Sequence, residues 1–196
     1  MKSARLCILA DTHIKNFKSI PPDIEMAIKD ADFIIHLGDF TSPDLLDYFK
    51  TFNNFYGIAG NHDPHCIKSI LPKATVIEIN KKRLGLLHGY WFPFICDSRS
   101  LRRFKNENVD AIIFGHTHVV RNDDSSGMLF FNPGSASALW PAPEKTYGVL
   151  EIGETIQRKI NLLGTKRKDN KRKTSGERVI ELVCGKNRLK NCIDTY

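Results

Sequence analysis

Residues 6–13 of the chain read LCILADTH, an apolar run that ends in an aspartate and a histidine. Four more apolar runs, at residues 33–35, 55–58, 84–87 and 111–114, are followed by glycine and by Asp, Asn or His, and the polar clusters are 22 to 28 residues apart. Short apolar runs of this kind are typical of buried strands, and the spacing is close to one strand-helix repeat of roughly 30 residues. The pattern predicts an α/β protein whose polar side chains gather at the carboxyl ends of its strands.

The segments between and after these runs indicate how the strands are assembled. Helices are expected in four places, beginning at Pro22, Pro43 and Pro64 and spanning residues 98–105. After the last polar cluster, strands joined by short turns are expected at residues 128–131, 146–152 and 156–163. The first half therefore follows a βαβα pattern and the second half resembles a meander. This change favours two sheets packed face to face with helices on the outside.

Seven side chains in the polar clusters have the chemistry of metal ligands, and we expect them on one rim of one sheet. They are Asp11, His13, Asp39, Asn61, His88, His116 and His118. Imidazoles mixed with carboxylate and amide oxygens suit Mn²⁺, Fe or Zn²⁺, and an asparagine ligand argues against a closed structural zinc site. Two divalent cations need a bridging carboxylate, which only Asp11 or Asp39 can supply. The cluster predicts a two-metal site.

Such a site suggests the chemistry of a phosphate-ester hydrolase. Two divalent cations about 3.5–4 Å apart lower the pKa of a shared water, so that hydroxide exists near neutral pH. They also neutralise a phosphate while that hydroxide attacks in line. The expected substrate is therefore a phosphate ester, and the expected activity is metal-dependent hydrolysis.

Five motifs in this order resemble the signature of the calcineurin-like metallophosphoesterase superfamily. They are Asp11-x-His13, Gly38-Asp39, Gly60-Asn61-His62-Asp63, His88-Gly89 and Gly115-His116-Thr117-His118. The compact size and the turn at residues 132–135 are similar to the small phosphodiesterase branch, and the resemblance covers residues 5–163. It implies an αββα sandwich of two packed mixed sheets flanked by helices. It also implies a binuclear phosphoesterase that hydrolyses phosphodiesters by attack of a metal-bridging hydroxide.

The resemblance also implies a role for each site residue. One metal would be held by Asp11, His13, Asp39 and His118, and the other by Asp39, Asn61, His88 and His116, so that Asp39 is the bridge. Mn²⁺ is the expected metal, with Fe, Zn²⁺ or Ni²⁺ as alternatives.

His62 and Asp63 are the implied catalytic residues. His62 would protonate the leaving oxygen or stabilise the transition state, and Asp63 would orient its ring. Many small phosphodiesterases of this branch carry Cys at the position of His62, so this chain departs from them, which widens the expected range of substrates.

Composition and charge suggest a folded domain at residues 1–164 and a basic tail, ordered at most in part, at residues 165–196. The tail carries +6 of the net charge of +7. It lacks aromatic residues interleaved with its basic ones, so a nuclease that uses the tail on nucleic acid is a weaker alternative. A non-catalytic protein-interaction scaffold on the same fold, like a retromer subunit, is the other alternative, but it would not need all seven ligands.

Other sequence features bear on location and substrate. The five cysteines form no CxxC pair, the apolar stretch at residues 6–10 is too short for a signal peptide, and no run approaches a membrane span, so we expect a cytoplasmic protein without a membrane partner. The aromatic segment at residues 90–94 directly follows His88. It is expected to line a substrate pocket, to bind a partner or to pack in the core.

Overall fold

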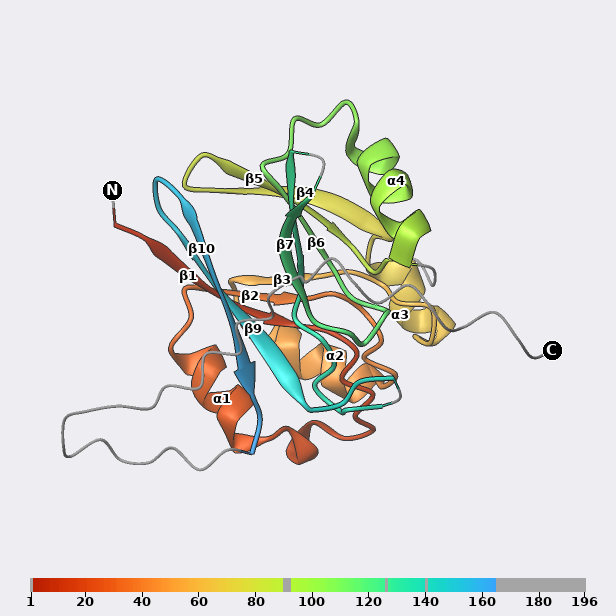
Figure 1. The fold of residues 1–196 in the computed structure, drawn as a ribbon. Helices are drawn as coiled ribbons and strands as arrows, with labels where there is room; N and C mark the ends of the chain where they lie inside the picture. The colour runs from red at the N-terminus through yellow and green to blue at the C-terminus, as the bar shows by residue number, and fades with distance from the viewer. Residues whose placement is uncertain (1, 90–92, 126, 140, 165–196) are drawn as a thin grey trace. The chain divides into compact units, whose positions relative to one another are not determined.

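The computed structural model describes residues 2–89, 93–125, 127–139 and 141–164 of the chain. In this part of the chain, ten strands form two five-stranded sheets with helices against them (Figure 1). The two mixed sheets flanked by helices confirm the predicted fold class. The basic tail and residues 90–92 of the aromatic segment lie outside the described residues, and the division at residue 164 stays a prediction.

The first sheet has the strand order β10-β9-β1-β2-β3. Its strands are β1 (Ala4–Leu9), β2 (Phe33–His36), β3 (Phe55–Gly57), β9 (Thr146–Ile152) and β10 (Ile156–Leu162). The strands β1, β2 and β3 run parallel, whereas β9 pairs antiparallel with β1 and β10 pairs antiparallel with β9. The carboxyl ends of β1, β2 and β3 therefore open at one edge of this sheet.

The second sheet has the order β4-β5-β6-β8-β7. Its strands are β4 (Ala74–Ile79), β5 (Lys82–Leu87), β6 (Ala111–Phe114), β7 (Arg121–Ser125) and β8 (Met128–Asn132). The three inner strands are parallel, and the edge strands β4 and β7 are antiparallel to their neighbours. The segments that follow β5, β6 and β8 consequently leave the sheet at the same edge.

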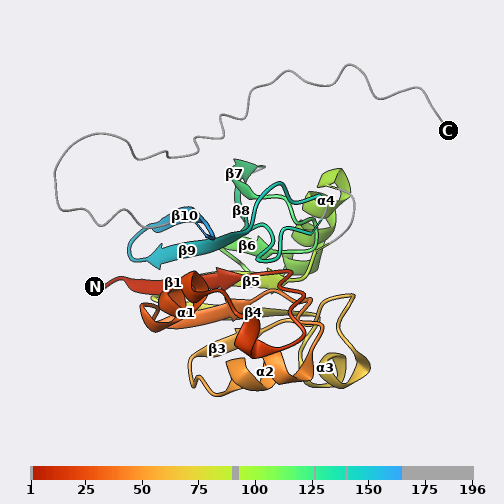
Figure 2. The same cartoon turned by 90° about the horizontal axis from the view of Figure 1, so that it is seen from below.

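Helices cover the outer faces of both sheets. They are η1, a 3₁₀ helix (Phe17–Ser19), and the α-helices α1 (Pro22–Lys29), α2 (Pro43–Lys50), α3 (His65–Ile70) and α4 (Pro93–Phe104). Figure 2 shows α2 and α4 on opposite sides of the two sheets. Both α1 and α2 begin with proline in the first turn, as predicted, and α4 begins five residues before the predicted residue 98. None of the described helices has the length and hydrophobicity of a membrane span.

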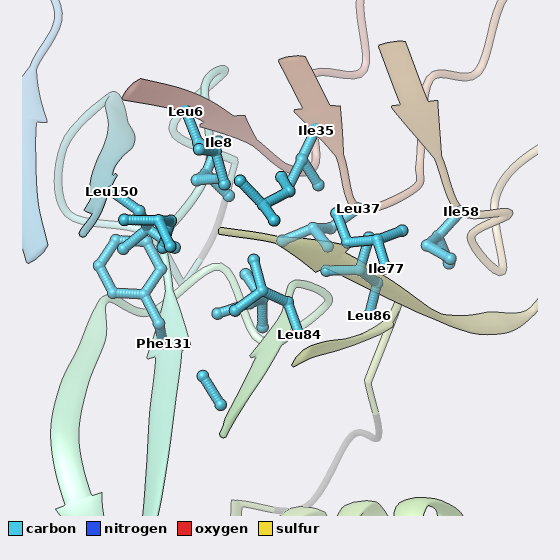
Figure 3. Packing of buried hydrophobic residues seen from close by; sticks show 14 of the residues in the cluster. Leu6, Ile8, Ile35, Leu37, Ile58, Ile77, Leu84, Leu86, Phe131 and Leu150 are labelled. Carbon is cyan, nitrogen blue, oxygen red and sulfur yellow. The ribbon is translucent and has the colours of Figure 1, made fainter. Parts of the chain in front are cut away.

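The main core lies between the facing sides of the two sheets. Figure 3 shows side chains from both sheets meeting there. Leu6, Ile8 and Leu150 come from the first sheet and Leu84 and Phe131 from the second, and all five are fully buried. Burial of this apolar area stabilises the sandwich and holds the two sheet edges in place.

The structure corrects the expectation that the polar clusters share one rim of one sheet. The first three clusters follow β1, β2 and β3 of the first sheet, whereas the last two follow β5 and β6 of the second. The boundary between the sheets also does not follow the two halves of the sequence, because β9 returns to pair with β1 (Figure 1). Two strands, β4 and β7, were not predicted. Because the polar clusters follow strands of both sheets, the site lies across the junction of the two sheets.

His36 at the end of β2 is a buried structural residue beneath this junction. Its ring stacks on Phe40 with centroids 3.7 Å apart, Nδ1 accepts the N–H of Gly38 at 3.2 Å, and Nε2 lies 3.1 Å from Thr12 Oγ1. Since Nδ1 accepts, Nε2 carries the proton and donates to Thr12. Burial lowers the pKa of His36 to about 3 despite the nearby Asp39 charge. The ring is therefore neutral, as the hydrogen bonds require.

His36 should make the free energy of unfolding depend on pH. The unfolded chain protonates this histidine near pH 6.5, whereas the folded chain does so only near pH 3, so its contribution is present at neutral pH and is lost as the pH falls below 6.5. Denaturant unfolding of the wild type and of His36→Gln should show their stability difference shrinking by about 2 kcal/mol between about pH 7.5 and pH 5. A difference that stays constant over this range would contradict a neutral buried ring.

Candidate metal centre

The seven predicted ligands come from five loops that meet where the two sheets pack together. Asp11 and His13 follow β1, Asp39 follows β2, Asn61 follows β3, His88 follows β5, and His116 and His118 follow β6. Hydrogen bonds connect these loops across the sheets: the N–H of Asp11 donates to Gly38 O, and the N–H of His116 donates to the Asp11 carboxylate. The sequence clusters that belong to different strands are therefore in contact in the fold.

Five of the seven residues have a left-handed backbone conformation. Their φ angles lie between +47° and +70°, and they are Asp11, His13, Asp39, His116 and His118. This conformation costs a residue with a side chain roughly 1–3 kcal/mol and persists where the surroundings enforce it. The strain turns the chain sharply after each strand, so that ligand-type side chains point to one place.

The first group of side chains contains ligand-type atoms that lack hydrogen-bond partners. One ligand atom from each of Asp11, His13, Asp39 and His118 lies within 4.8 Å of all the others. Asp11 Oδ1 is 3.4 Å from His118 Nε2, and Asp39 Oδ2 is 3.6 Å from His13 Nε2. Asp11 Oδ1, Asp39 Oδ2 and His13 Nε2 are buried without a hydrogen-bond partner. Buried polar atoms are costly when unpaired, and these carboxylate oxygens and imidazole nitrogens fit a divalent cation.

The second group adjoins the first. Asn61 Oδ1 lies 2.8 Å from His88 Nε2 and 2.7 Å from His116 Nδ1, and the two histidine nitrogens are 3.2 Å apart. His88 Nδ1 donates to the carbonyl of Leu37 at 2.6 Å, which leaves Nε2 to face the group. An imidazole that donates its second nitrogen to a backbone carbonyl is the usual arrangement of a metal-binding histidine.

Asp39 lies between the two groups. Its Oδ2 faces His13 of the first group, and its Oδ1 is 3.5 Å from His88 Nε2 of the second. Asp11 Oδ2, in contrast, accepts the N–H of His116, and Asp11 Oδ1 faces His118. Asp11 Oδ1 also lies 4.0 Å from His88 Nε2, but of the two carboxylates Asp39 is the one that presents a different oxygen to a ligand-type side chain of each group.

The electrostatics of the site favour bound positive charge. Burial raises the pKa of Asp39, but the interactions with His88, with the backbone N–H of His62 and with His13 together outweigh burial and lower the pKa to about 2. Burial likewise lowers the pKa of His88, but Asp39 and Asp11 outweigh it and raise the pKa overall. The pKa values of His13 and His116 are lowered, first by burial and also by neighbouring histidines. The pKa shifts of Asp39, His13 and His116 favour the ionised carboxylate and neutral imidazoles that metal binding needs, whereas the raised pKa of His88 means that its ring must lose a proton when it binds a cation.

Asp63 has partners other than the predicted one. Its buried carboxylate accepts three backbone N–H groups, from Gly60 at 2.7 Å, Thr41 at 2.9 Å and Asp39 at 3.1 Å. In the described residues no hydrogen bond joins it to the ring of His62, and the orienting role expected of Asp63 stays a prediction. The carboxylate faces the main chain of the loops after β2 and β3, which it ties together at Asp39.

His62 is exposed at the edge of the first group. Its ring lies edge-on to that of His13, with centroids 5.6 Å apart, and its backbone N–H donates to Asp39 Oδ1 at 2.8 Å. The side chain is therefore accessible to a substrate and lies next to the candidate ligands. It is not among the side chains that form either group.

Three side chains that fix the loops of the candidate ligands were not predicted from the sequence. The residues concerned are Asn132, Ser135 and Ser137, which bond to the loops after β1 and β6. Their only signal was the turn motif at residues 132–135, which indicated a bend but not its contacts.

Comparison with known proteins identifies the family. Residues 4–155 match the family model described as the calcineurin-like phosphoesterase superfamily domain. The chain belongs to this superfamily. The phosphoesterase domain is 37% identical over 131 residues to a probable metallophosphoesterase of Methanothermobacter thermautotrophicus. The aligned region covers 65% of this chain and 74% of that protein. The domain is 30% identical over 155 residues to a probable metallophosphoesterase of Methanocaldococcus jannaschii, and this alignment covers 78% of each chain.

Solved structures share the fold of this phosphoesterase. A Thermotoga maritima protein is 32% identical with a TM-score of 0.66, and the match covers 82% of this chain and 99% of that one. An archaeal phosphodiesterase has a TM-score of 0.63 at 24% identity, covering 81% and 99%. The vacuolar protein sorting protein Vps29 of Cryptosporidium parvum has a TM-score of 0.63 at 20% identity, covering 82% and 98%. The last two matches show a common fold alone.

If Asp63 holds the loops and does not act through His62, its substitution should destabilise the fold. Asp63→Asn replaces one acceptor oxygen by an amide nitrogen that faces backbone N–H groups, so the free energy of unfolding should fall by about 1–3 kcal/mol. Denaturant titration measures this loss. His62→Ala, at an exposed side chain, should leave the stability nearly unchanged. Equal stabilities of the two variants would contradict a loop-holding role for Asp63 and favour the role predicted from the sequence, the orientation of the His62 ring.

Proposed function

We propose that this chain is a two-metal phosphodiesterase. The observation that carries the proposal is the position of Asp39, whose two oxygens face two adjoining groups of ligand-type side chains. A carboxylate in this position can serve two cations at once, which is the arrangement of a binuclear hydrolase. Membership in the calcineurin-like phosphoesterase superfamily supports the same reaction class.

The proposed ligands divide as the two groups do. Asp11, His13, Asp39 and His118 would hold one cation, and Asp39, Asn61, His88 and His116 the other. Two divalent cations, when bound, lower the pKa of a shared water and neutralise the charge of a phosphate. We propose Mn²⁺, because imidazole, carboxylate and amide ligands together suit it.

Two side chains that are not proposed ligands, His62 and Asp63, also have proposed roles in the reaction. His62 is exposed beside the first group, and we assign it the protonation of the leaving oxygen or the stabilisation of charge on the phosphate. The Asp63 carboxylate accepts the N–H groups of Gly60 and Asp39. These bonds fix the loop of His62 relative to the proposed bridging residue Asp39. Asp63 acts as a positioning residue.

A diester is the favoured substrate class, and a scaffold role is the rival. The archaeal structure of the same fold is named a phosphodiesterase, whereas Vps29 structures share the fold and bear the name of a sorting protein. A scaffold has no need for buried carboxylate and imidazole atoms without partners, so the three such atoms in the first group favour the enzyme. A cytoplasmic location remains part of the proposal, and a nuclease that uses the basic tail remains its less favoured alternative.

Asp39→Asn should abolish hydrolysis of bis(p-nitrophenyl) phosphate. The amide offers one oxygen and one nitrogen that does not bind metal, so it cannot bridge two cations. Turnover at saturating Mn²⁺ is measured for this variant and for Asp47→Asn, a control at an exposed position on α2. Near-normal turnover of Asp39→Asn would overturn the bridging assignment.

His62→Ala should lower turnover and leave metal content nearly unchanged. General-acid help is worth ~10²–10⁴-fold and matters most for poor leaving groups, so an alkyl ester should lose more activity than a nitrophenyl ester. His65→Ala, exposed on α3, is the matched control. Equal losses on both esters would exclude the general-acid role, and loss of bound Mn²⁺ would make His62 a ligand.

A further inference from the structure

The segment after β8, residues 132–139, supplies none of the proposed ligands but contacts three parts of the site. Asn132 is fully buried at the end of β8, and its Nδ2 donates to Gly115 O and to Thr117 Oγ1, each at 3.0 Å. Gly115 and Thr117 flank His116, and Thr117 precedes His118. One side chain therefore holds the turn that carries two proposed ligands.

Two serines of the segment fix the main chain at Asp11. Ser135 Oγ and Ser137 Oγ lie 2.9 Å and 3.1 Å from Asp11 O and donate to it, and the N–H of Ala136 donates to Ala10 O at 3.2 Å. Asp11 has a φ of +50°, a conformation that needs support from its surroundings. The two hydroxyls occupy both lone pairs of its carbonyl and so stabilise the orientation of its carboxylate.

The end of the segment fixes the ring of His118. The Leu139 carbonyl lies 3.1 Å from His118 Nδ1, and since a carbonyl only accepts, Nδ1 donates. In a neutral ring the lone pair is then on Nε2, and Nε2 faces Asp11 Oδ1 at 3.4 Å. The Leu139 carbonyl thus selects the tautomer that can bind a cation.

We propose that residues 132–139 form a clasp that sets metal affinity, with Asn132 and Ser137 as positioning residues. This rests on the proposed function, because the affinity in question is that of the proposed metal centre. The contacts are not those of an ordinary turn: the side chain of Asn132 bonds to residues 15 and 17 positions away, and the Ser137 hydroxyl to a residue 126 positions away. The clasp joins the loop after β1 to the loop after β6, one from each sheet.

The test is a Mn²⁺ titration of the full chain by isothermal calorimetry, with the melting temperature of each metal-free variant. Ser137→Ala should weaken Mn²⁺ binding about tenfold, and Asn132→Ala about 10- to 100-fold, the range typical of groups behind metal ligands. Ser137→Thr keeps the hydroxyl and should restore the wild-type affinity. Ser69→Ala on α3 and Asn122→Ala on β7, both exposed, are matched controls that should bind as the wild type does.

Wild-type Mn²⁺ affinity in Ser137→Ala, whatever its melting temperature, would overturn the clasp and leave the segment a structural turn. Because Ser137 is only half-buried, this variant decides the question even if Asn132→Ala fails to fold. Failure of Ser137→Thr to restore affinity would equally count against it. A wild-type chain that binds Mn²⁺ but hydrolyses no phosphodiester would overturn the proposed function, whereas the clasp is judged by the affinities alone.

Discussion

Two buried carboxylates lie beside one buried and three half-buried imidazoles where the edges of two sheets meet, and this arrangement is costly unless the polar atoms have partners. Asp11 and Asp39 are fully buried, and each has one oxygen without a hydrogen-bond partner. Stranding a buried charge in this way costs several kcal/mol, which a bound cation can offset. The strained loops, the hydrogen bonds of Asp63 and the contacts of residues 132–139 all serve to keep these oxygens in place.

Packing in the core of the sandwich offsets the free-energy cost of gathering these polar groups. The main apolar core lies between the sheets and also holds the first residue after β1, β2 and β3, so the loops can present polar side chains beyond these anchored positions. Left-handed residues such as Asp39 and His116 can then be tolerated, because the strands before them are held by core residues such as Ile35 and Ile113. Close approach of the loops also requires glycine: a Cβ at Gly60 would touch the Asp39 carboxylate and backbone. The packed core therefore stabilises the fold enough to hold the strained, left-handed backbone of the site loops.

Local sequence patterns predicted the strands with ligands, most helices and the two-sheet architecture, because apolar periodicity and turn residues are local signals. They could not show that β9 pairs with β1 nearly 150 positions away, since no local pattern encodes the partner. The polar strand β7 has no apolar alternation and forms by pairing with β8. In β4, the alternation of Ile77, Glu78 and Ile79 offered a signal that was overlooked.

The same limit applies to the candidate site. The seven ligand-type residues were identifiable because each follows a strand and has ligand chemistry. The partners of Asp63 and Ser137 are backbone groups of distant loops, which become neighbours only in the fold. A side chain that binds main-chain groups leaves no residue-type pattern for its partners, so roles of this kind are visible only in the structure.

The most direct test of the central claim is a crystal structure of the chain grown with Mn²⁺, with the metal located by anomalous scattering. We expect two peaks about 3.5–4 Å apart with one oxygen of Asp39 or both facing them, and with His13 and His88 on opposite sides. A single peak, or two peaks that Asp39 does not bridge, would contradict it.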